Sequence, residues 1–237
     1  MNKTRRFLSL LLTLVLTLSL CVIPAAAANT QARSDDPVVF VHGLMGWGER
    51  AGLNSVLPYW GMTTGSLTDY LSAKGYETYA ASVGPLSSAW DRACELYAQL
   101  VGARTDYGVK HSQDFGHDRY GIDYEQPLFD GWGTERAVNL VGHSFGGATT
   151  RLFLEILTNG CPEEVAAARA AGVEPSPFFL GGKGSWVHSL TAIAAPHNGT
   201  TFIETCGDFT MVAAELATSI SKALGLSVFK GVYDFQL

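Results

Sequence analysis

The sequence contains a short apolar run joined directly to the pattern G-x-S-x-G, in the stretch Ala137-Val138-Asn139-Leu140-Val141-Gly142-His143-Ser144-Phe145-Gly146. Residues 137–141 predict a buried strand, and residues 146–158 predict a helix that Asn159-Gly160 ends. Between a strand and a helix, this pattern is typical of a sharp turn that holds the serine in a strained conformation above the sheet edge. We therefore predict that Ser144 is a nucleophile.

A glycine-rich turn of this kind has two other interpretations, a turn without catalytic purpose and a phosphate-binding loop. A dinucleotide-binding loop needs G-x-G-x-x-G, and a P-loop needs Gly-Lys followed by Ser or Thr. Neither pattern is present in the sequence. The catalytic interpretation of Ser144 is the one that the flanking strand and helix favour.

A second motif, His42-Gly43-Leu44, follows directly after a predicted strand over residues 37–41. It resembles the loop that supplies one oxyanion-hole amide in hydrolases with a nucleophilic serine at such a turn. The predicted oxyanion hole therefore consists of the backbone N–H groups of Leu44 and Phe145. His42 precedes the serine in the chain, and we interpret it as a structural histidine that orients this loop.

Predicted strands and helices alternate along the chain. The strands cover residues 37–41, 76–83, 137–141 and 186–195, and the helices cover 66–74, 87–101, 146–158, 162–171 and 211–224. A segment without regular periodicity, 102–134, separates two of these units. This alternation predicts an α/β fold in one domain, with a mainly parallel sheet and helices on both faces.

The N-terminus has the features of a secretory signal peptide. Three basic residues precede an apolar run over 7–23, and four alanines at 25–28 offer a cleavage site. A membrane anchor is the alternative, since the run approaches spanning length. We predict a signal peptide over 1–28 and secretion of the domain over 29–237. The mature chain has 13 Lys and Arg against 22 Asp and Glu, a net charge of −9, which argues against a nucleic-acid partner.

The sequence does not offer an obvious base for Ser144. In α/β-hydrolases the order along the chain is Ser, then Asp or Glu, then His. After Ser144 the histidines, His188 and His197, both precede the two aspartates. A glutamate at 163 or 164 with His197 would fit the order, but these glutamates open a predicted helix. We therefore expect the triad Asp and His to be absent from this chain, and the sheet to be truncated before its last strands.

Several motifs together resemble a known family. They are residues 40–48 (FVHGLMGWG), 90–95 (WDRACE), 106–108 (DYG), the G-x-S-x-G stretch, 195–201 (APHNGTT) and 233–235 (YDF). In this order and spacing they resemble bacterial lipase subfamily I.5, which comprises secreted, zinc-binding triacylglycerol lipases with the α/β-hydrolase fold. The resemblance covers residues 36–237 and corresponds to the N-terminal portion of such a lipase.

The resemblance implies a structural zinc in an insertion around residues 91–134. Carried over by position, Asp91, His111 and His117 are zinc ligands, and the fourth ligand would follow the last residue of the chain. Two imidazoles and carboxylates suit tetrahedral zinc. Without the resemblance, solvated loop histidines are the favoured interpretation of His111 and His117. The resemblance also implies a lid region around 208–226, and a calcium site only in a longer form.

The expected function is that of a secreted lipase, which hydrolyses carboxylic ester bonds of acylglycerols through an acyl-enzyme on Ser144. Its partner would be a lipid or ester substrate at an oil–water interface, and no stable protein partner is implied. Two alternatives stay open. One is a short-chain carboxylesterase or acyltransferase, and the other is a catalytically inactive lipase fragment that only binds zinc or lipid.

Overall fold

The computed structural model describes residues 35–200, apart from the side chain of Thr63. The predicted signal peptide over 1–28, the helix expected over 211–224 and the lid region expected around 208–226 lie outside the described residues. Among the helices that are described, none is long and apolar enough to cross a membrane.

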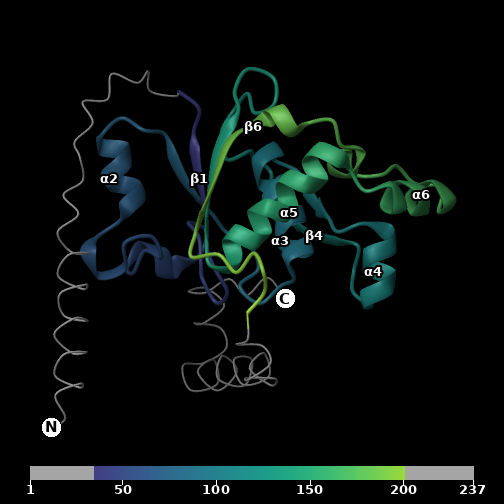
Figure 1. Cartoon of the computed structure of the whole chain (residues 1–237), viewed down its shortest axis with the longest axis horizontal. Coiled ribbons are helices and arrows are strands. Elements are labelled where there is room, and N and C mark those ends of the chain that lie inside the picture. The colour runs from purple at the N-terminus through teal and green to yellow at the C-terminus, as the bar shows by residue number, and fades with distance from the viewer. Residues whose placement is uncertain (1–34, 201–237) are drawn as a thin grey trace, which may run out of the picture. The chain divides into compact units, whose positions relative to one another are not determined.

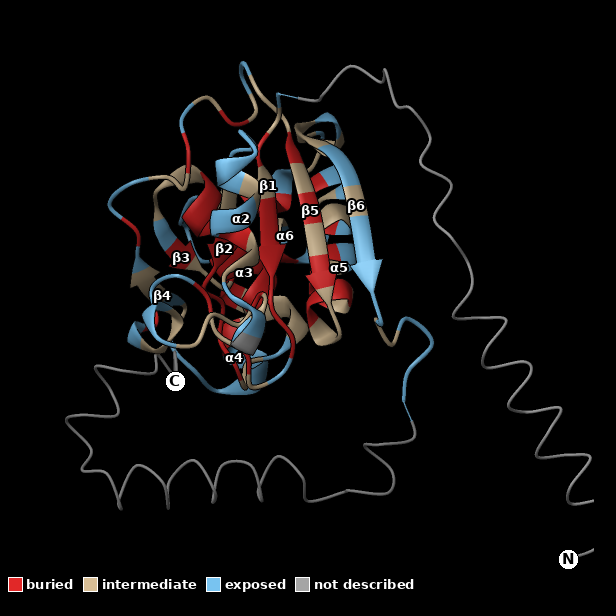
Figure 2. Cartoon of the chain, turned by 90° about the vertical axis from the view of Figure 1, so that its left-hand side faces the viewer, coloured by how far each residue is buried: buried red, intermediate tan, exposed pale blue. Residues whose placement is uncertain are grey.

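Four parallel strands form the central sheet (Figure 1), in the spatial order β2-β1-β5-β6 that Figure 2 labels. They are β1 (Val38–Val41), β2 (Thr78–Ala81), β5 (Val138–His143) and β6 (Val187–Ile193). β1 lies between β2 and β5, with Phe40 opposite Ala80 on one side and Val141 on the other. The parallel α/β sheet predicted from the sequence is confirmed. Because all four strands run the same way, the turn after β5 and the loop after β1 meet at one edge of the sheet.

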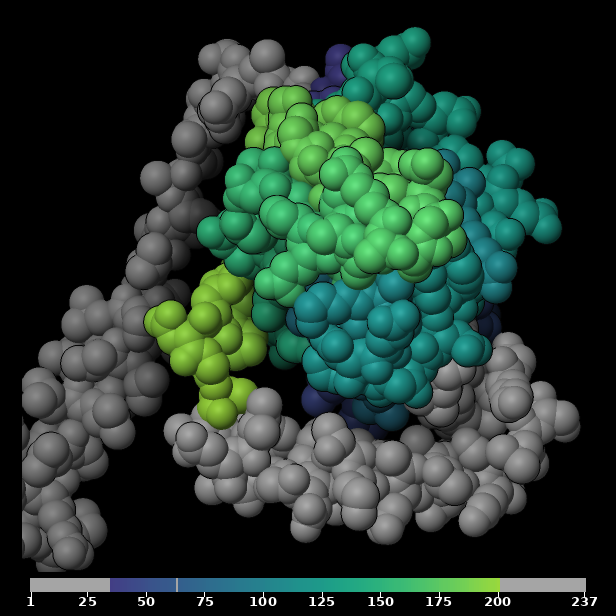
Figure 3. All heavy atoms as spheres, turned by 90° about the vertical axis from the view of Figure 1, so that its right-hand side faces the viewer, coloured from purple at the N-terminus to yellow at the C-terminus, as the bar shows by residue number. Residues whose placement is uncertain are grey.

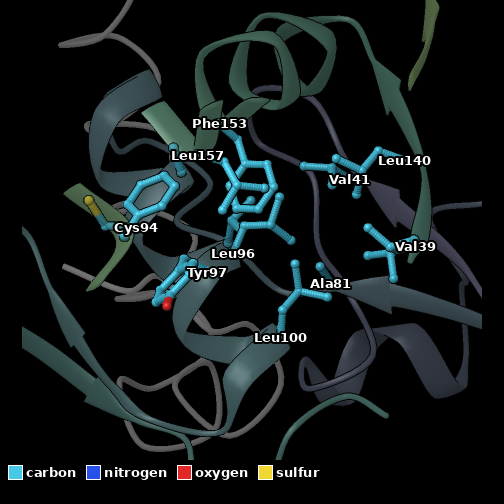
Figure 4. Close-up of a cluster of buried hydrophobic side chains, with 14 of the residues drawn as sticks. Val39, Val41, Ala81, Cys94, Leu96, Tyr97, Leu100, Leu140, Phe153 and Leu157 are labelled. Atoms are coloured by element: carbon cyan, nitrogen blue, oxygen red, sulfur yellow. The ribbon is translucent and has the colours of Figure 1, made fainter. Parts of the chain in front are cut away.

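The two faces of the sheet are covered by different helices. Figure 1 shows α2 (Leu67–Ala73) on one side of β1, and α3 (Ala89–Val101) and α5 (Phe145–Asn159) on the other. Along β1, Val39 and Val41 belong to the large core cluster beneath α3 and α5, whereas Phe40 belongs to a smaller cluster with Trp60. This alternation follows from the strand geometry. Figure 4 shows Leu96 of α3 and Phe153 of α5 beside these valines in the large cluster.

Capping residues and a proline mark the ends of the longer helices. Ser88 caps α3 in a capping box with Asp91, and Gly102 ends the helix in the left-handed region. α6 (Pro162–Ala170) has proline at its first position, where no backbone N–H is needed. The described part of the chain also contains four short 3-10 helices: η1 (Gly52–Ser55), η2 (Met62–Thr64), η3 (Pro177–Leu180) and η4 (Gly184–Trp186).

The segment 102–134, for which the sequence predicted no regular structure, contains a strand pair and a helix. β3 (Arg104–Asp106) pairs antiparallel with β4 (Tyr120–Asp123), and α4 (Val109–Phe115) lies between them in the chain. These elements are too short to produce a periodic pattern. α4 also lacks a side-chain N-cap of its own, because its first N–H groups donate to Glu164 of α6. α4 and α6 pack against each other on the surface that Figure 3 shows.

Burial across the sheet is uneven. β1 is buried along most of its length, and β5 alternates buried and half-buried residues. β6 stands at the edge of the described sheet and is mostly exposed (Figure 2). The best-packed strands are therefore β1 and β5, the two that position the predicted oxyanion loop and nucleophile.

Candidate active site and metal centre

Ser144 occupies the turn between β5 and α5 in a strained backbone conformation. Its φ is 53° and its ψ is −124°, in a region that residues with a Cβ rarely adopt. Two backbone hydrogen bonds hold the turn: the Ser144 N–H donates to the Ile193 carbonyl at 2.9 Å, and the Gly147 N–H donates to the Ser144 carbonyl at 3.0 Å. Strain that the surrounding structure maintains is a feature of functional sites, and here it falls on the predicted nucleophile.

The glycines around Ser144 allow three elements to approach one another. A Cβ at Gly146 would lie 2.1 Å from the Val41 carbonyl oxygen, and one at Gly142 would lie 2.5 Å from the Gly146 carbonyl oxygen. No side chain fits at these distances, so both positions require glycine for the contact of α5 with β1 and β5. The two glycines of the G-x-S-x-G motif are therefore explained by the close approach of the backbones of α5, β1 and β5.

The loop after β1, residues 42–46 and hereafter the His42 loop, lies directly beside Ser144. A Cβ at Gly43 would lie 3.0 Å from the Ser144 Cβ. The Gly43 carbonyl is held by the His42 ring at 2.8 Å and accepts from the Gly46 N–H at 3.1 Å. The N–H of the same peptide unit belongs to Leu44, and it forms no hydrogen bond within residues 35–200. Phe145 is the first residue of α5, so its N–H has no intrahelical acceptor. The two predicted oxyanion donors therefore belong to segments that meet at Ser144.

His42 is fully buried, and its ring contacts the backbone of its own loop and of Val83. Its Nδ1 contacts the Gly43 carbonyl, and its Nε2 accepts from the Val83 N–H at 3.4 Å. Burial, reinforced by the positive charge of Arg92, lowers the pKa of His42 to about 3. The ring is therefore neutral, donates through Nδ1 and accepts through Nε2. This agrees with the interpretation of His42 as a structural residue.

Asp91, His111 and His117 come together in a second cluster. Their ligand atoms lie within 4.8 Å of one another, although they come from α3, α4 and the turn after α4. Asp91 Oδ1 lies 2.9 Å from His111 Nε2 and 3.8 Å from His117 Nε2. Asp91 Oδ2 accepts from the Ser88 hydroxyl at 2.7 Å, so one carboxylate serves both the helix cap and the cluster.

Neighbouring residues orient His111. The Trp90 ring stacks on His111 with centroids 5.2 Å apart and planes at 17°, and the Glu164 carboxylate accepts the His111 N–H at 2.6 Å. The three side chains are only 11–34% exposed. Two imidazole nitrogens and a carboxylate oxygen are ligands that zinc prefers. The cluster could therefore hold a divalent metal ion, as the family resemblance implied.

Comparison with known proteins assigns the chain to a family. The model of the family described as "Lipase-like, C-terminal domain" matches residues 34–233. The chain belongs to this lipase-like family. Among its relatives are a lipase of Staphylococcus epidermidis, 38% identical over 200 residues, and lipase 2 of Staphylococcus aureus, 39% identical over 206 residues. These matches cover 84% and 86% of the chain but only 29% of each relative, so the chain spans less than a third of their length.

Solved lipase structures share the fold of this lipase-like chain. Staphylococcus hyicus lipase is 40% identical with a TM-score of 0.75, over 88% of this chain and 52% of that one. Lipase 1 from Pelosinus fermentans is 42% identical with a TM-score of 0.73, over 86% of this chain and 52% of that one. The α/β architecture and the family are therefore established together.

No histidine of the lipase-like chain is hydrogen-bonded to Ser144 in the described residues, which include all six histidines. His188 is at the start of β6, 3.1 Å from Asp36, whereas Ser144 follows the other end of the sheet. His197 is exposed beside the outer face of α5, in a shallow pocket with Arg151 and Glu155. Glu164, a possible partner of His197 in the sequence, caps α4 instead.

A row of buried polar residues on α3 was not predicted from the sequence. Arg92, Glu95 and Gln99 are each at most 2% exposed, although α3 was predicted from its apolar stripe. Gln99 exchanges two hydrogen bonds with the Ser82 backbone, at 2.9 and 2.8 Å. Glu95 accepts from the Gly84 N–H at 2.6 Å, and burial raises its pKa to about 7. In the sequence, Arg92, Glu95 and Gln99 are spaced so that they share one helix face. Charged residues are rarely buried without partners, so a polar row on one face could have indicated a buried network.

Proposed function

We propose that this chain is part of a secreted lipase of subfamily I.5, which hydrolyses carboxylic ester bonds of acylglycerols. The observation that carries the proposal is the strained Ser144 between β5 and α5, beside the Gly43 backbone. Membership of the lipase-like family and the names of the relatives support lipid esters as the substrate class. The substrate would be met at an oil–water interface.

The proposed mechanism is acyl transfer in two steps. Ser144 Oγ attacks the ester carbonyl carbon while a base removes its proton, and the N–H groups of Leu44 and Phe145 stabilise the carbonyl oxygen as it becomes negative. The alcohol then leaves with that proton, and an ester to Ser144 forms. Water attacks this acyl-enzyme in the same way, which releases the fatty acid and restores the hydroxyl.

We propose that the base and its acidic partner are supplied by sequence beyond these 237 residues. All six histidines have other positions or partners, and the match covers only 29% of the Staphylococcus epidermidis lipase and 52% of the Staphylococcus hyicus lipase chain. Without the base, the serine would retain only the assistance of the oxyanion hole, and the rate would fall by several powers of ten.

In this proposal Asp91, His111 and His117 are ligands of a structural zinc. The residues fit the group, since their ligand atoms converge from three segments and their donor types match. When bound, the ion would supply a rigid link between the start of α3 and the α4 segment. Cleavage near residue 28, a lid around 208–226 and calcium in a longer form belong to the same proposal.

The test is covalent labelling of Ser144 by a lipid-like fluorophosphonate, in this chain and in the full-length gene product, with Ser144→Ala as control. We expect serine-dependent labelling of the full-length product and slow labelling of the 237-residue chain. If the full-length product is unlabelled, the chain is an inactive member of the family. Hydrolysis of emulsified long-chain triglyceride against a soluble short ester then tests the substrate class. A preference for the soluble ester would favour a carboxylesterase.

A further inference from the structure

Arg92 is a buried cation whose contacts converge on the proposed oxyanion hole. It is fully buried in α3, and each guanidinium nitrogen donates to a different element. Nη2 donates to the His42 carbonyl, Nη1 to the Gly84 carbonyl at 2.8 Å, and Nε to the Thr149 hydroxyl at 3.0 Å. Two of these three acceptors flank Ser144, one from the His42 loop and one from α5.

On the side of the His42 loop, Arg92 holds the peptide unit between His42 and Gly43. Arg92 donates to its carbonyl, and the Tyr59 hydroxyl accepts from its N–H at 3.0 Å. The next peptide unit has its carbonyl held by the His42 ring and carries the Leu44 N–H. Two successive peptide planes are thus fixed, so the direction of the Leu44 N–H depends on the group that Arg92 holds.

On the side of α5, Arg92 reaches the residue that carries the other donor. The Thr149 hydroxyl accepts from Arg92 and donates to the Phe145 carbonyl at 3.0 Å. The guanidinium carbon also lies 5.1 Å from the centroid of the Phe145 ring. The same side chain therefore contacts both segments that form the hole.

We propose that Arg92 is a positioning residue that sets the Leu44 and Phe145 amides relative to each other; this rests on the proposed function of those amides. A guanidinium presents its donors in a rigid plane, so a shift of either segment breaks a hydrogen bond to a buried charge. A lysine at this position would keep the charge but could not reach three acceptors in fixed directions. Arg92 does not touch the reacting atoms and acts through the backbone.

The experiment compares Arg92→Lys, Thr149→Val and Gln99→Leu in the full 237-residue chain. Gln99→Leu is the matched control, because it removes another buried polar clamp of α3 that holds Ser82 and neither oxyanion segment. Hydrogen exchange, resolved by NMR, is measured at the bonded amides of Gly46 and Gly147, with urea unfolding as the measure of global stability. Labelling of Ser144 by the fluorophosphonate is measured in the full-length product.

We expect Arg92→Lys to speed exchange at both amides and to slow labelling by at least about tenfold, the range for a misplaced oxyanion donor. Thr149→Val, the milder change, should affect Gly147 and leave Gly46 unchanged. Gln99→Leu should affect neither amide beyond its effect on global stability. If Arg92→Lys changes exchange no more than Gln99→Leu at equal stability, Arg92 is a structural residue and the proposal is wrong. If the wild type is not labelled, the proposed function fails, while the exchange pattern still decides the role of Arg92.

Discussion

Glutamine in place of Glu164 tests how the proposed metal site is held together. The buried Glu164 carboxylate accepts from the Lys110 N–H at 2.9 Å and from the His111 N–H at 2.6 Å. Hydrogen bonds to a charged group contribute about 1.5–3 kcal/mol each. Glutamine keeps one acceptor oxygen but turns an N–H₂ toward the other donor. Glu164→Gln should therefore lower the free energy of unfolding by about 2–3 kcal/mol.

The same substitution should weaken zinc binding, because His111 is carried by the turn that Glu164 caps. Loss of a residue that orients a ligand typically costs about 10–100-fold in metal affinity. The assay is competition for zinc between the protein and a chelating dye, at a urea concentration where both variants are folded. Glu163→Gln is the control. Glu163 is 75% exposed and 4.0 Å from Lys110 Nζ, so its loss should change stability by less than about 1 kcal/mol.

An unchanged zinc affinity in Glu164→Gln, with the two glutamate variants indistinguishable, would refute this reasoning. It would mean that the α4 turn keeps its place without the carboxylate. A loss of stability without a loss of affinity would refute it in part, since the cap would then stabilise the fold without orienting His111.

Three further predictions follow from the geometry of the site. Gly146→Ala should destabilise the protein by about 1–3 kcal/mol in urea unfolding, because the new Cβ meets the Val41 carbonyl at 2.1 Å; a gain in stability, usual for alanine in an open helix, would contradict the packing described. The free energy of unfolding should fall as the pH drops from 6.5 towards 3, by up to about 1.4 kcal/mol per pH unit, because the unfolded His42 ring takes up a proton that the folded state excludes. His42→Gln should remove this component of the pH profile, and an unchanged profile would count against a buried neutral ring. His117→Ala removes a proposed ligand and should therefore weaken zinc binding more than Glu164→Gln does. Asp118→Asn should leave the zinc affinity unchanged, and the same dye competition measures both variants.

The elements with strong local signals were predictable from the sequence. β1 was found from its β-branched run, β5 from its short apolar run, and α3 from its apolar stripe. The turn at Ser144 was predictable because its glycines meet a steric demand that any such turn imposes. These features depend on a few adjacent residues, so no knowledge of the tertiary structure was needed.

The features that were missed depend on contacts between distant parts of the chain. α4 begins where Glu164, more than 50 residues away, accepts its N–H groups, so no local pattern marks its start. Arg92 and Gln99 were overlooked because an amphipathic helix is recognised by its apolar residues, and buried polar partners are invisible until the facing loops are known. The grouping of Asp91 with two histidines came from the family resemblance alone, since the three lie on separate elements.

The first turns of α3 join the two sites. Successive residues of a helix differ by about 100° in direction, so neighbours in the sequence face different surroundings. Asp91 faces the histidines and caps the helix through Ser88, whereas Arg92 faces the core and holds the His42 loop and α5. A ligand bound at Asp91 would restrain the backbone that carries the guanidinium. The proposed metal ion and the proposed oxyanion hole are therefore connected through two neighbouring residues of α3.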